Sequence, residues 1–169
     1  MHMNYDVVVV GGGHAGLEAA YAAARMGSRT LMITLSKDKI GHMPCNPAIG
    51  GIGKGHMVFE ISALGGLMPR LCTKTYLQAR MLNTRKGPAV QGLRLQIDKI
   101  AYRNESQSFL ATVPQLTILE GMVDEVILSS HKQVCGIRLS DGTVIATSTV
   151  VLTTGTFLNG LAHVGLAQF

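Results

Sequence analysis

Apolar positions near the start of the chain follow strand spacing, then helix spacing, then strand spacing again. Four consecutive valines end the segment Tyr5–Val10, which predicts a strand buried on both faces. The Ala-rich segment Leu17–Met26 predicts a helix, and Gly27 suits the left-handed residue that ends many helices. Arg29–Leu35 predicts a second strand. A strand–helix–strand unit this short indicates a parallel, doubly wound sheet.

The middle of the chain is less regular. Gly41–Gly66 holds 7 glycines in 26 residues, which predicts a long functional loop. This loop is expected to enter a helix over Lys54–Leu64, where apolar residues recur at helical spacing. Residues 75–110 are also expected to be helical, with an interruption at Gly87-Pro88.

Beyond Gln115 the pattern is typical of short strands. Asp141-Gly142 is a hairpin signal between two of them. The predicted strands are Thr117–Leu119, Val123–Leu128, Val134–Leu139, Thr143–Ala146 and Thr149–Thr153. The predicted fold class is therefore α/β, with a Rossmann-type parallel sheet and a small antiparallel β-meander.

Composition narrows the class of protein. The chain has 169 residues, which suits one domain with a single hydrophobic core. Hydrophobic residues make up 47%, which excludes a disordered or collagen-like chain. No apolar run approaches the ~20 residues of a membrane span, and the first residues lack the pattern of a secretory signal. The charged fraction of 15% is low against the usual ~25%, which hints that part of the surface is covered.

The net charge of +5 is distributed unevenly. All of the excess lies in residues 68–103, where Asp98 is the only acidic residue beside eight basic ones: Arg70, Lys74, Arg80, Arg85, Lys86, Arg94, Lys99 and Arg103. Lys and Arg neutralise phosphates, so this basic band is a candidate polyanion contact. A solvated helical face is the alternative. Four of the basic residues flank Gly87-Pro88, which indicates that some of them point into a site.

Gly11, Gly13 and Gly16 have the spacing of a dinucleotide-binding turn. The first glycine allows the tight turn, the second lets the backbone approach a pyrophosphate, and the third lets the helix pack on the strand. A glycine turn without a ligand is the alternative. The acidic residue that usually contacts the ribose is missing from Thr34–Ser36, where only hydroxyls are available, and this weakens the case for a standard NAD site.

The glycine-rich stretch 43–56 allows three interpretations. A phosphate-binding P-loop fails because Gly55 stands where Ser or Thr is needed. A metal site built from His42, Cys45 and His56 has no recognised ligand spacing. The third interpretation is a backbone loop shaped against a flat ligand, to which Lys54 and a helix N-terminus add positive potential.

The three cysteines, Cys45, Cys72 and Cys135, form no close pair and no disulfide framework, which fits a reducing compartment. Cys45 lies in the electropositive loop, where a thiol can act as a nucleophile. The alternative is a small buried hydrophobic residue. His14, in the glycine turn, is more consistent with a packing or turn residue than with a base.

Taken together, these residues resemble the MnmG (GidA) family of FAD-dependent tRNA-modifying enzymes. The matching segments run in order through nearly the whole chain: Tyr5-Asp6-Val7, Gly11–Gly16, Ala22–Gly27, Cys45–His56, Ala63–Met68, Arg80–Asn83, Lys86–Val90 and Leu152–Leu158. The loop Cys-Asn-Pro-Ala-Ile-Gly-Gly that begins at Cys45 separates this family from a related folate-dependent tRNA methyltransferase. The chain departs from the usual bacterial pattern at Gln91, Gly92 and Leu95.

The resemblance implies a glutathione-reductase-like FAD-binding Rossmann domain over residues 1–169. With the GTPase MnmE, the family adds an aminomethyl or carboxymethylaminomethyl group to C5 of the wobble uridine of tRNA. Methylenetetrahydrofolate supplies the carbon, glycine or ammonium supplies the nitrogen, and NADH reduces the flavin. A homodimer without a membrane anchor is implied. The absence of an Arg-rich transit segment favours the cytoplasm over a mitochondrion or plastid.

The resemblance also assigns roles to residues. The FAD-binding set is Gly11, Gly12, Gly13, His14, Ala15, Gly16, Val123, Thr154, Gly155 and Thr156, with Val123 facing the adenine. Cys45 is the implied nucleophile or acid/base near the flavin. The substrate and active-site loop set is Asn46, Gly50, Gly51, Lys54 and Arg94, and no metal is expected.

Members of this family are several times longer than this chain. The resemblance therefore implies a truncated N-terminal part that lacks the nicotinamide site and the region that docks tRNA, and we expect it to be inactive alone. Two other functions stay open. One is a flavin-binding module without catalysis, and the other is an NAD(P)H–flavin reductase acting on a small molecule.

Overall fold

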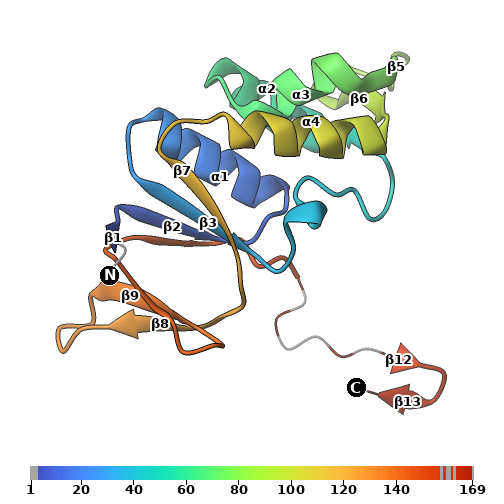
Figure 1. The fold of residues 1–169 in the computed structure, drawn as a ribbon. Helices are drawn as coiled ribbons and strands as arrows, with labels where there is room; N and C mark the ends of the chain where they lie inside the picture. Colours follow the sequence, from blue (N-terminus) through green and yellow to red (C-terminus); the bar gives the residue numbers. More distant parts are fainter. Residues whose placement is uncertain (1–3, 157, 159–160, 162, 169) are drawn as a thin grey trace.

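The computed structural model describes residues 4–156, 158, 161 and 163–168 (Figure 1). Phe157, part of a segment that carries the family resemblance, lies outside the described residues. In chain order the elements are β1 (Asn4–Tyr5), β2 (Val7–Val10), α1 (His14–Arg25), β3 (Thr30–Thr34), a 3₁₀ turn (Lys37–Lys39), β4 (Ala48–Gly50), α2 (Lys54–Ala63), α3 (Leu67–Thr75), β5 (Tyr76–Leu82), a 3₁₀ turn (Pro88–Val90), β6 (Gly92–Ile97), α4 (Lys99–Ala111), β7 (Leu116–Glu120), β8 (Val123–Leu128), β9 (Val134–Leu139), β10 (Val144–Thr147), β11 (Val150–Leu152), β12 (His163–Val164) and β13 (Ala167–Gln168).

The predicted parallel sheet is confirmed. Its strands are ordered β11-β2-β3-β7 and all run parallel. Helices α1 and α4 lie on one face, and the strands β8, β9 and β10 lie on the other (Figure 1). Val9 packs with the helices while Val8 and Val10 pack toward the β-meander, so the valine run is buried on both sides.

The predicted β-meander is also confirmed. Strands β8, β9 and β10 pair antiparallel in sequence, and β1 joins β10 at the edge. Gly142 has φ +86 in the turn between β9 and β10, and the Thr143 amide donates to Asp141 Oδ1 at 2.8 Å. The Asp-Gly signal therefore forms the expected tight hairpin.

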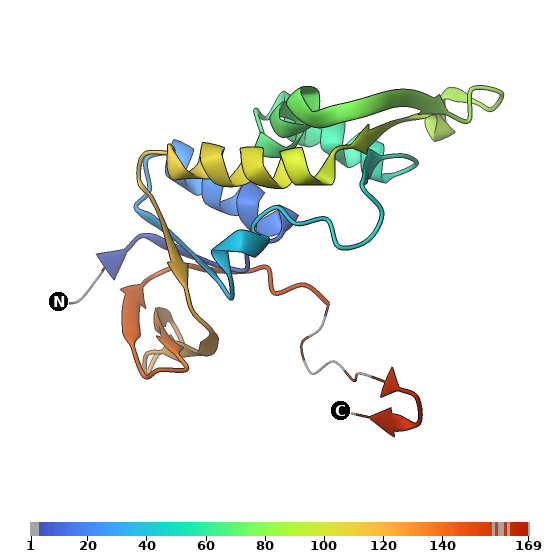
Figure 2. The same ribbon diagram turned by 45° about the vertical axis from the view of Figure 1, so that its right-hand side comes forward.

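The helix predicted over residues 75–110 is wrong for most of its length. Tyr76–Leu82 and Gly92–Ile97 are strands, and they form an antiparallel sheet ordered β4-β6-β5. Only Lys99–Ala111 is the long helix that was expected. Leu77, Ala79 and Met81 favour helix by propensity, but pairing with β6 overrides that weak local preference. Figure 2 shows this β5–β6 hairpin projecting from the rest of the molecule.

Helix α3 was not predicted, and its start depends on a residue far away in the chain. Its N-cap residue, Gly66, makes no side-chain capping hydrogen bond. The Glu18 carboxylate of α1 instead accepts from the amides of Leu67, at 2.9 Å, and Met68. Glu18 thus caps α3 across the interface between the two helices.

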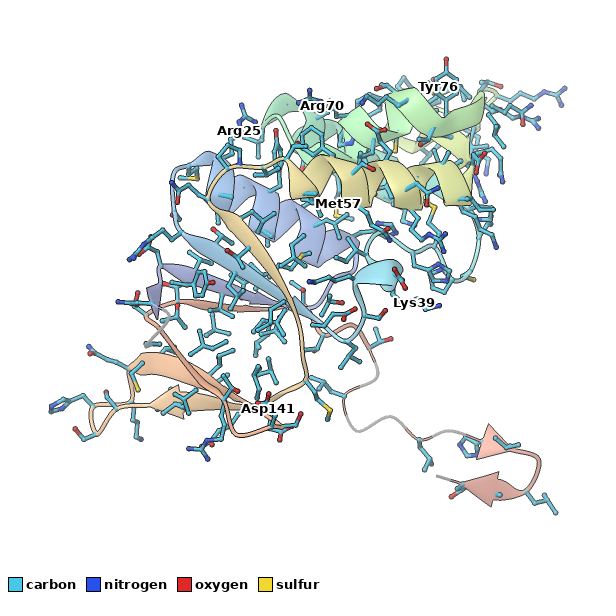
Figure 3. The ribbon with its side chains drawn as sticks, in the orientation of Figure 1. Arg25, Lys39, Met57, Arg70, Tyr76 and Asp141 are labelled. Atoms are coloured by element: carbon cyan, nitrogen blue, oxygen red, sulfur yellow. The ribbon has the colours of Figure 1, made fainter. Side chains whose placement is uncertain are left out.

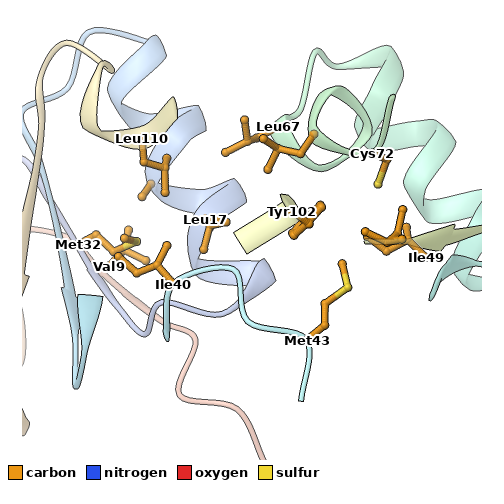
Figure 4. Packing of buried hydrophobic residues seen from close by; sticks show 13 residues of the cluster. Val9, Leu17, Met32, Ile40, Met43, Ile49, Leu67, Cys72, Tyr102 and Leu110 are labelled. Atoms are coloured by element: carbon orange, nitrogen blue, oxygen red, sulfur yellow. The ribbon is translucent and has the colours of Figure 1, made fainter. Parts of the chain in front are cut away.

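One hydrophobic cluster joins the parallel sheet to the β4-β6-β5 sheet. Tyr102 of α4 lies at its centre, between Leu17 of α1 and Ile49 of β4 (Figure 4). Its side chain is 1% exposed, and burial raises the pKa of its hydroxyl. The two parts of the chain are therefore packed as one body. In the described part of the chain, no helix combines the length and apolar character that crossing a membrane requires.

Candidate functional site

The three glycines of the dinucleotide-binding pattern have different surroundings. A Cβ on Gly11, at φ +118, would lie 2.3 Å from the Thr153 carbonyl oxygen, and one on Gly16 would lie 1.9 Å from the Gly11 carbonyl oxygen. Around a Cβ on Gly13 there is no protein atom within 4 Å. Gly11 and Gly16 are thus required for packing inside the protein, whereas Gly13 borders open space. The close packing expected of Gly11 and Gly16 is present, and the approach of Gly13 to a pyrophosphate stays a prediction.

The N-terminus of α1 faces that same open space. Gly13 is its N-cap residue, with no side-chain capping bond and no acidic residue in the first turn. Backbone amides at a helix N-terminus lack partners within the helix, and the helix dipole makes this end positive. An anion such as a pyrophosphate is the group this arrangement favours.

The sheet brings Thr154, Gly155 and Thr156 beside the glycine turn. Strand β11 pairs with β2, and the Thr153 hydroxyl donates to the Val10 carbonyl oxygen at 2.8 Å. The three residues that follow are exposed. Two segments far apart in the sequence therefore form one edge of the predicted cofactor site.

Val123 is the first residue of β8, which follows β7, the strand beside β3 in the parallel sheet. The Gly121 amide donates to the Thr34 carbonyl oxygen at 2.9 Å, which holds the start of β8 near the end of β3. The Thr34 hydroxyl donates to the Ser36 carbonyl oxygen at 3.3 Å and lies against Gly12, so it is engaged within the protein. Ser36 is half-buried and is the remaining hydroxyl among the residues that replace the usual acid.

A carboxylate that the sequence pattern did not indicate lies beside the end of β3. Glu120 lies opposite Thr34 across β7 and β3, and its Oε1 accepts from the Lys37 amide at 2.7 Å. The end of β3 therefore has an acidic neighbour in space, although none follows β3 directly in sequence. The parallel register creates this neighbour, and the local sequence carries no signal for it.

His14 packs within the protein, as expected for a packing residue. Its ring contacts Tyr102 edge-on, with 5.6 Å between ring centroids. Burial lowers the pKa of His14, and the nearby charge of Lys54 lowers it further, so the neutral form is favoured. Its Nδ1 atom is buried without a hydrogen-bond partner in the described structure.

Gly50 and Gly51 press against protein backbone. Both have φ near +100, at +97 and +103. The Gly51 amide donates to the Leu93 carbonyl oxygen at 2.8 Å, and a Cβ on Gly50 would lie 2.1 Å from that oxygen. These glycines allow the loop to pack on β6, and their contact with a substrate stays a prediction. Lys54 follows at the first position of α2, exposed and near enough to His14 to affect its pKa.

Cys45 and Asn46 are exposed on a loop that is anchored at both ends. At one end the Gly41 amide donates to the Gly12 carbonyl oxygen at 3.2 Å, and at the other the Ile97 amide donates to the Pro47 carbonyl oxygen at 2.8 Å. The loop therefore joins the glycine turn to strand β6.

The exposure of Cys45 excludes the alternative of a small buried hydrophobic residue. That role belongs to Cys72, which is 1% exposed. Burial raises the pKa of the Cys72 thiol to about 12, and the charge of Glu18 raises it further. Cys45, in contrast, has an accessible thiol on the loop, and its role toward a substrate stays a prediction.

Arg94 lies on the middle strand of the β4-β6-β5 sheet. It is opposite Gly50 of β4 on one side and Arg80 of β5 on the other. The sheet therefore places Arg94 beside Gly50 of the glycine-rich loop, and its contact with a substrate stays a prediction. Within the described residues, no three His, Cys, Asp or Glu side chains cluster in a way that could hold a metal ion, so His42, Cys45 and His56 do not form such a cluster.

These features define an α/β protein of the Rossmann-type FAD-binding class. At the level of the fold alone, the chain is similar to pqsL of Pseudomonas aeruginosa, a probable FAD-dependent monooxygenase. The TM-score is 0.60 at 19% identity, over 87% of this chain and 41% of that one.

The family model named "Glucose inhibited division protein A" matches residues 6–169, and the chain belongs to that family. The structure of Aquifex aeolicus GidA matches with a TM-score of 0.92 and 50% identity over 98% of this chain and 27% of that one. The tRNA uridine 5-carboxymethylaminomethyl modification enzyme MnmG of Lactococcus lactis is 52% identical over 98% of this chain and 27% of its own length. The mitochondrial 5-taurinomethyluridine-[tRNA] synthase subunit MTO1 of Mus musculus is 49% identical over 96% and 25%. The chain thus spans about a quarter of the length of these relatives.

Proposed function

We propose that residues 1–169 are the FAD-binding part of an enzyme that modifies C5 of the wobble uridine in tRNA. Family membership and the printed activities of the two curated relatives support the uridine chemistry. The observation that carries the proposal is the placement of Cys45. Its exposed loop is bonded to the glycine turn at Gly12 and to β6, the strand of Arg94.

The residues of the turn fit FAD. The uncapped N-terminus of α1 and the open space beside Gly13 suit the pyrophosphate. Thr154, Gly155 and Thr156 border the same edge, and the backbone of Val123 would meet the adenine. When bound, FAD supplies two-electron redox chemistry.

The chain's own residues have distinct tasks in this proposal. Cys45 acts on the uridine as nucleophile or as acid/base, since its thiol is accessible. Lys54 and Arg94 bring positive charge toward the anionic substrate, and Asn46 offers polar groups beside Cys45. The backbone around Gly50 and Gly51 holds this loop against β6.

The remaining participants belong to the whole enzyme. We infer NADH as reductant, methylenetetrahydrofolate as carbon donor and glycine or ammonium as nitrogen donor. We further infer an MnmE-type GTPase partner and a homodimer, with no membrane attachment. Relatives of bacterial and mitochondrial origin fit either a cytoplasmic or an organellar setting. The 169-residue chain alone is expected not to catalyse the modification of uridine.

The test is Cys45→Ser in the intact protein, with Cys135→Ser as the matched control because Cys135 is also exposed. Modified uridine in tRNA is measured by mass spectrometry of nucleosides, and FAD content by visible absorption. Cys45→Ser should abolish modification while FAD stays bound, and Cys135→Ser should retain both. Full modification by Cys45→Ser would remove Cys45 from the chemistry.

A further inference from the structure

Two groups of residues in the basic band differ in their surroundings, and the first group, Arg70 and Lys74, has partners inside the protein. The Arg70 guanidinium lies over the Phe109 ring, 4.8 Å from its centroid. The Lys74 ammonium is paired with the Glu105 carboxylate. Asp98, the only acid of the band, accepts from two backbone amides at the start of α4. Its charge is therefore used at a helix N-terminus.

The second group lies on the β5–β6 hairpin. It consists of Arg80, Arg85, Lys86 and Arg94. Within the part of the chain that the structure describes, none of these four side chains has a carboxylate within ion-pair distance. Figure 3 shows side chains that end in nitrogen atoms extending from the far end of the hairpin, beyond Tyr76. Arg80, Arg85 and Lys86 are exposed and Arg94 is half-buried, so the hairpin carries positive charge that no carboxylate of the described residues neutralises.

Arg80 and Arg94 are direct cross-strand neighbours. Residues opposite each other share a face, and like charges at such a position destabilise a sheet. The other face of β6 carries Leu93 and Leu95, which line a cavity with residues of α2 and α3. The arginine pair therefore lies on the face directed away from those helices. An anion between the two guanidinium groups would remove the repulsion.

The turn of the hairpin is held in shape before any partner binds. Asn83, at φ +57, donates from Nδ2 to the Val90 carbonyl oxygen at 3.0 Å. Gln91 donates from Nε2 to the Lys86 carbonyl oxygen at 2.9 Å, which gives a role to one departure from the family pattern. Ordered backbone beneath Arg85 and Lys86 lowers the entropy cost of placing their charges on a ligand.

We propose that the β5–β6 hairpin binds the phosphate backbone of the RNA substrate, with Arg80 and Arg94 sharing one phosphate and Arg85 and Lys86 contacting its neighbours. This inference rests on the proposed function. An RNA backbone fits because the four charges are spread along a projecting strand pair. A single nucleotide would need them gathered in one pocket. The contact is to phosphates and is independent of base sequence.

The test measures binding of a fluorescein-labelled RNA stem–loop by fluorescence anisotropy over a series of salt concentrations, with the intact protein. The hairpin variant is Arg85→Gln with Lys86→Gln. The matched control is Arg70→Gln with Lys74→Gln, which removes the same charge from the same band. The hairpin variant should bind the RNA at least about tenfold more weakly than the unaltered protein. The slope of log binding constant against log salt concentration should be less steep by about 0.7 for each lost phosphate contact. The control should change affinity by less than about twofold.

Three results would overturn the inference. Equal weakening by both double variants would mean that only overall charge matters, and unchanged binding by the hairpin variant would remove the contact. If the unaltered intact protein binds no RNA, the proposed function is overturned together with the inference. If the unaltered protein binds RNA and the hairpin variant binds equally well, only the inference is overturned. Arg80→Gln adds a second readout, since it should raise the melting temperature by relieving repulsion while it weakens RNA binding. A lower melting temperature would contradict the cross-strand argument.

Discussion

The parallel sheet and the β4-β6-β5 sheet use their side chains in opposite ways. All five residues of β3 are buried, whereas β5 exposes six of its seven residues. In the parallel sheet, packing on both faces fixes the backbone and with it the glycine turn. In the β5–β6 hairpin, backbone pairing holds the strands and leaves the side chains free for contacts. Substitutions in the first region should therefore damage folding, and those in the second should mainly change binding.

The largest expected effect is from Leu31→Ala on β3. Leu31 is 1% exposed, so truncation leaves a cavity between the sheet and the β-meander. We expect the free energy of unfolding to fall by about 2–5 kcal/mol. Urea denaturation followed by circular dichroism measures the change. A decrease in the free energy of unfolding below about 0.5 kcal/mol would show that packing of this sheet contributes little to the stability of the fold.

Next in size is Glu18→Gln, which weakens the cap that α1 provides for α3. The variant loses the negative charge and one acceptor oxygen, so the expected loss is about 1–2 kcal/mol by the same measurement. Glu60→Gln, an exposed glutamate of α2, is the matched control and should stay within about 0.5 kcal/mol. Identical effects from the two variants would argue against a cap across the interface.

The stability of the protein should depend on the protonation of His14. The pKa of His14 in the folded state is below the usual 6.5. At a pH between the folded-state pKa and 6.5, the unfolded chain therefore binds more protons at this residue than the folded chain does. The free energy of unfolding should therefore fall as the pH drops through about 6.5 toward the folded-state pKa, and should be fully retained above that range. Denaturation at about pH 7.5 and about pH 5.5 should show a smaller pH dependence for His14→Gln than for the unaltered protein. The same dependence in both would mean that His14 is not the group responsible.

The smallest effect is expected on the hairpin. Leu77 of β5 is 69% exposed, so Leu77→Ala should change the free energy of unfolding by less than about 0.5 kcal/mol. It is the direct counterpart of Leu31→Ala. A loss as large as that of Leu31→Ala would mean that β5 packs against something in solution and would break the contrast between the two sheets.

Local signals predicted the first region well. The valine run, the glycine turn and the helix that follows are adjacent in sequence, so their pattern predicts β2, α1 and β3 together. The helix begins at His14, earlier than the predicted Leu17, because the turn leads directly into it. The Asp141-Gly142 turn is likewise decided by its own residues.

The features that the sequence pattern did not predict depend on contacts between residues far apart in the chain. Strand β5 is set by pairing with β6, against the helix propensity of its residues. The start of α3 depends on Glu18, 49 residues before Leu67. At the candidate site, the exposure of Cys45 follows from anchors at Gly12 and Ile97, and the position of Glu120 follows from the parallel register. Neither was readable from neighbouring residues.

The central claim is that the turn beside Gly13 holds the pyrophosphate of FAD, and titration of the intact protein with FAD tests it most directly. Gly13→Ala has room for its methyl and an ordinary φ of −78, so folding should be unchanged while the methyl obstructs the ligand. Gly87→Ala, also in open space at φ −61, is the matched control. FAD affinity should fall at least about tenfold for Gly13→Ala and should be unchanged for Gly87→Ala. Unchanged affinity in Gly13→Ala would contradict the central claim.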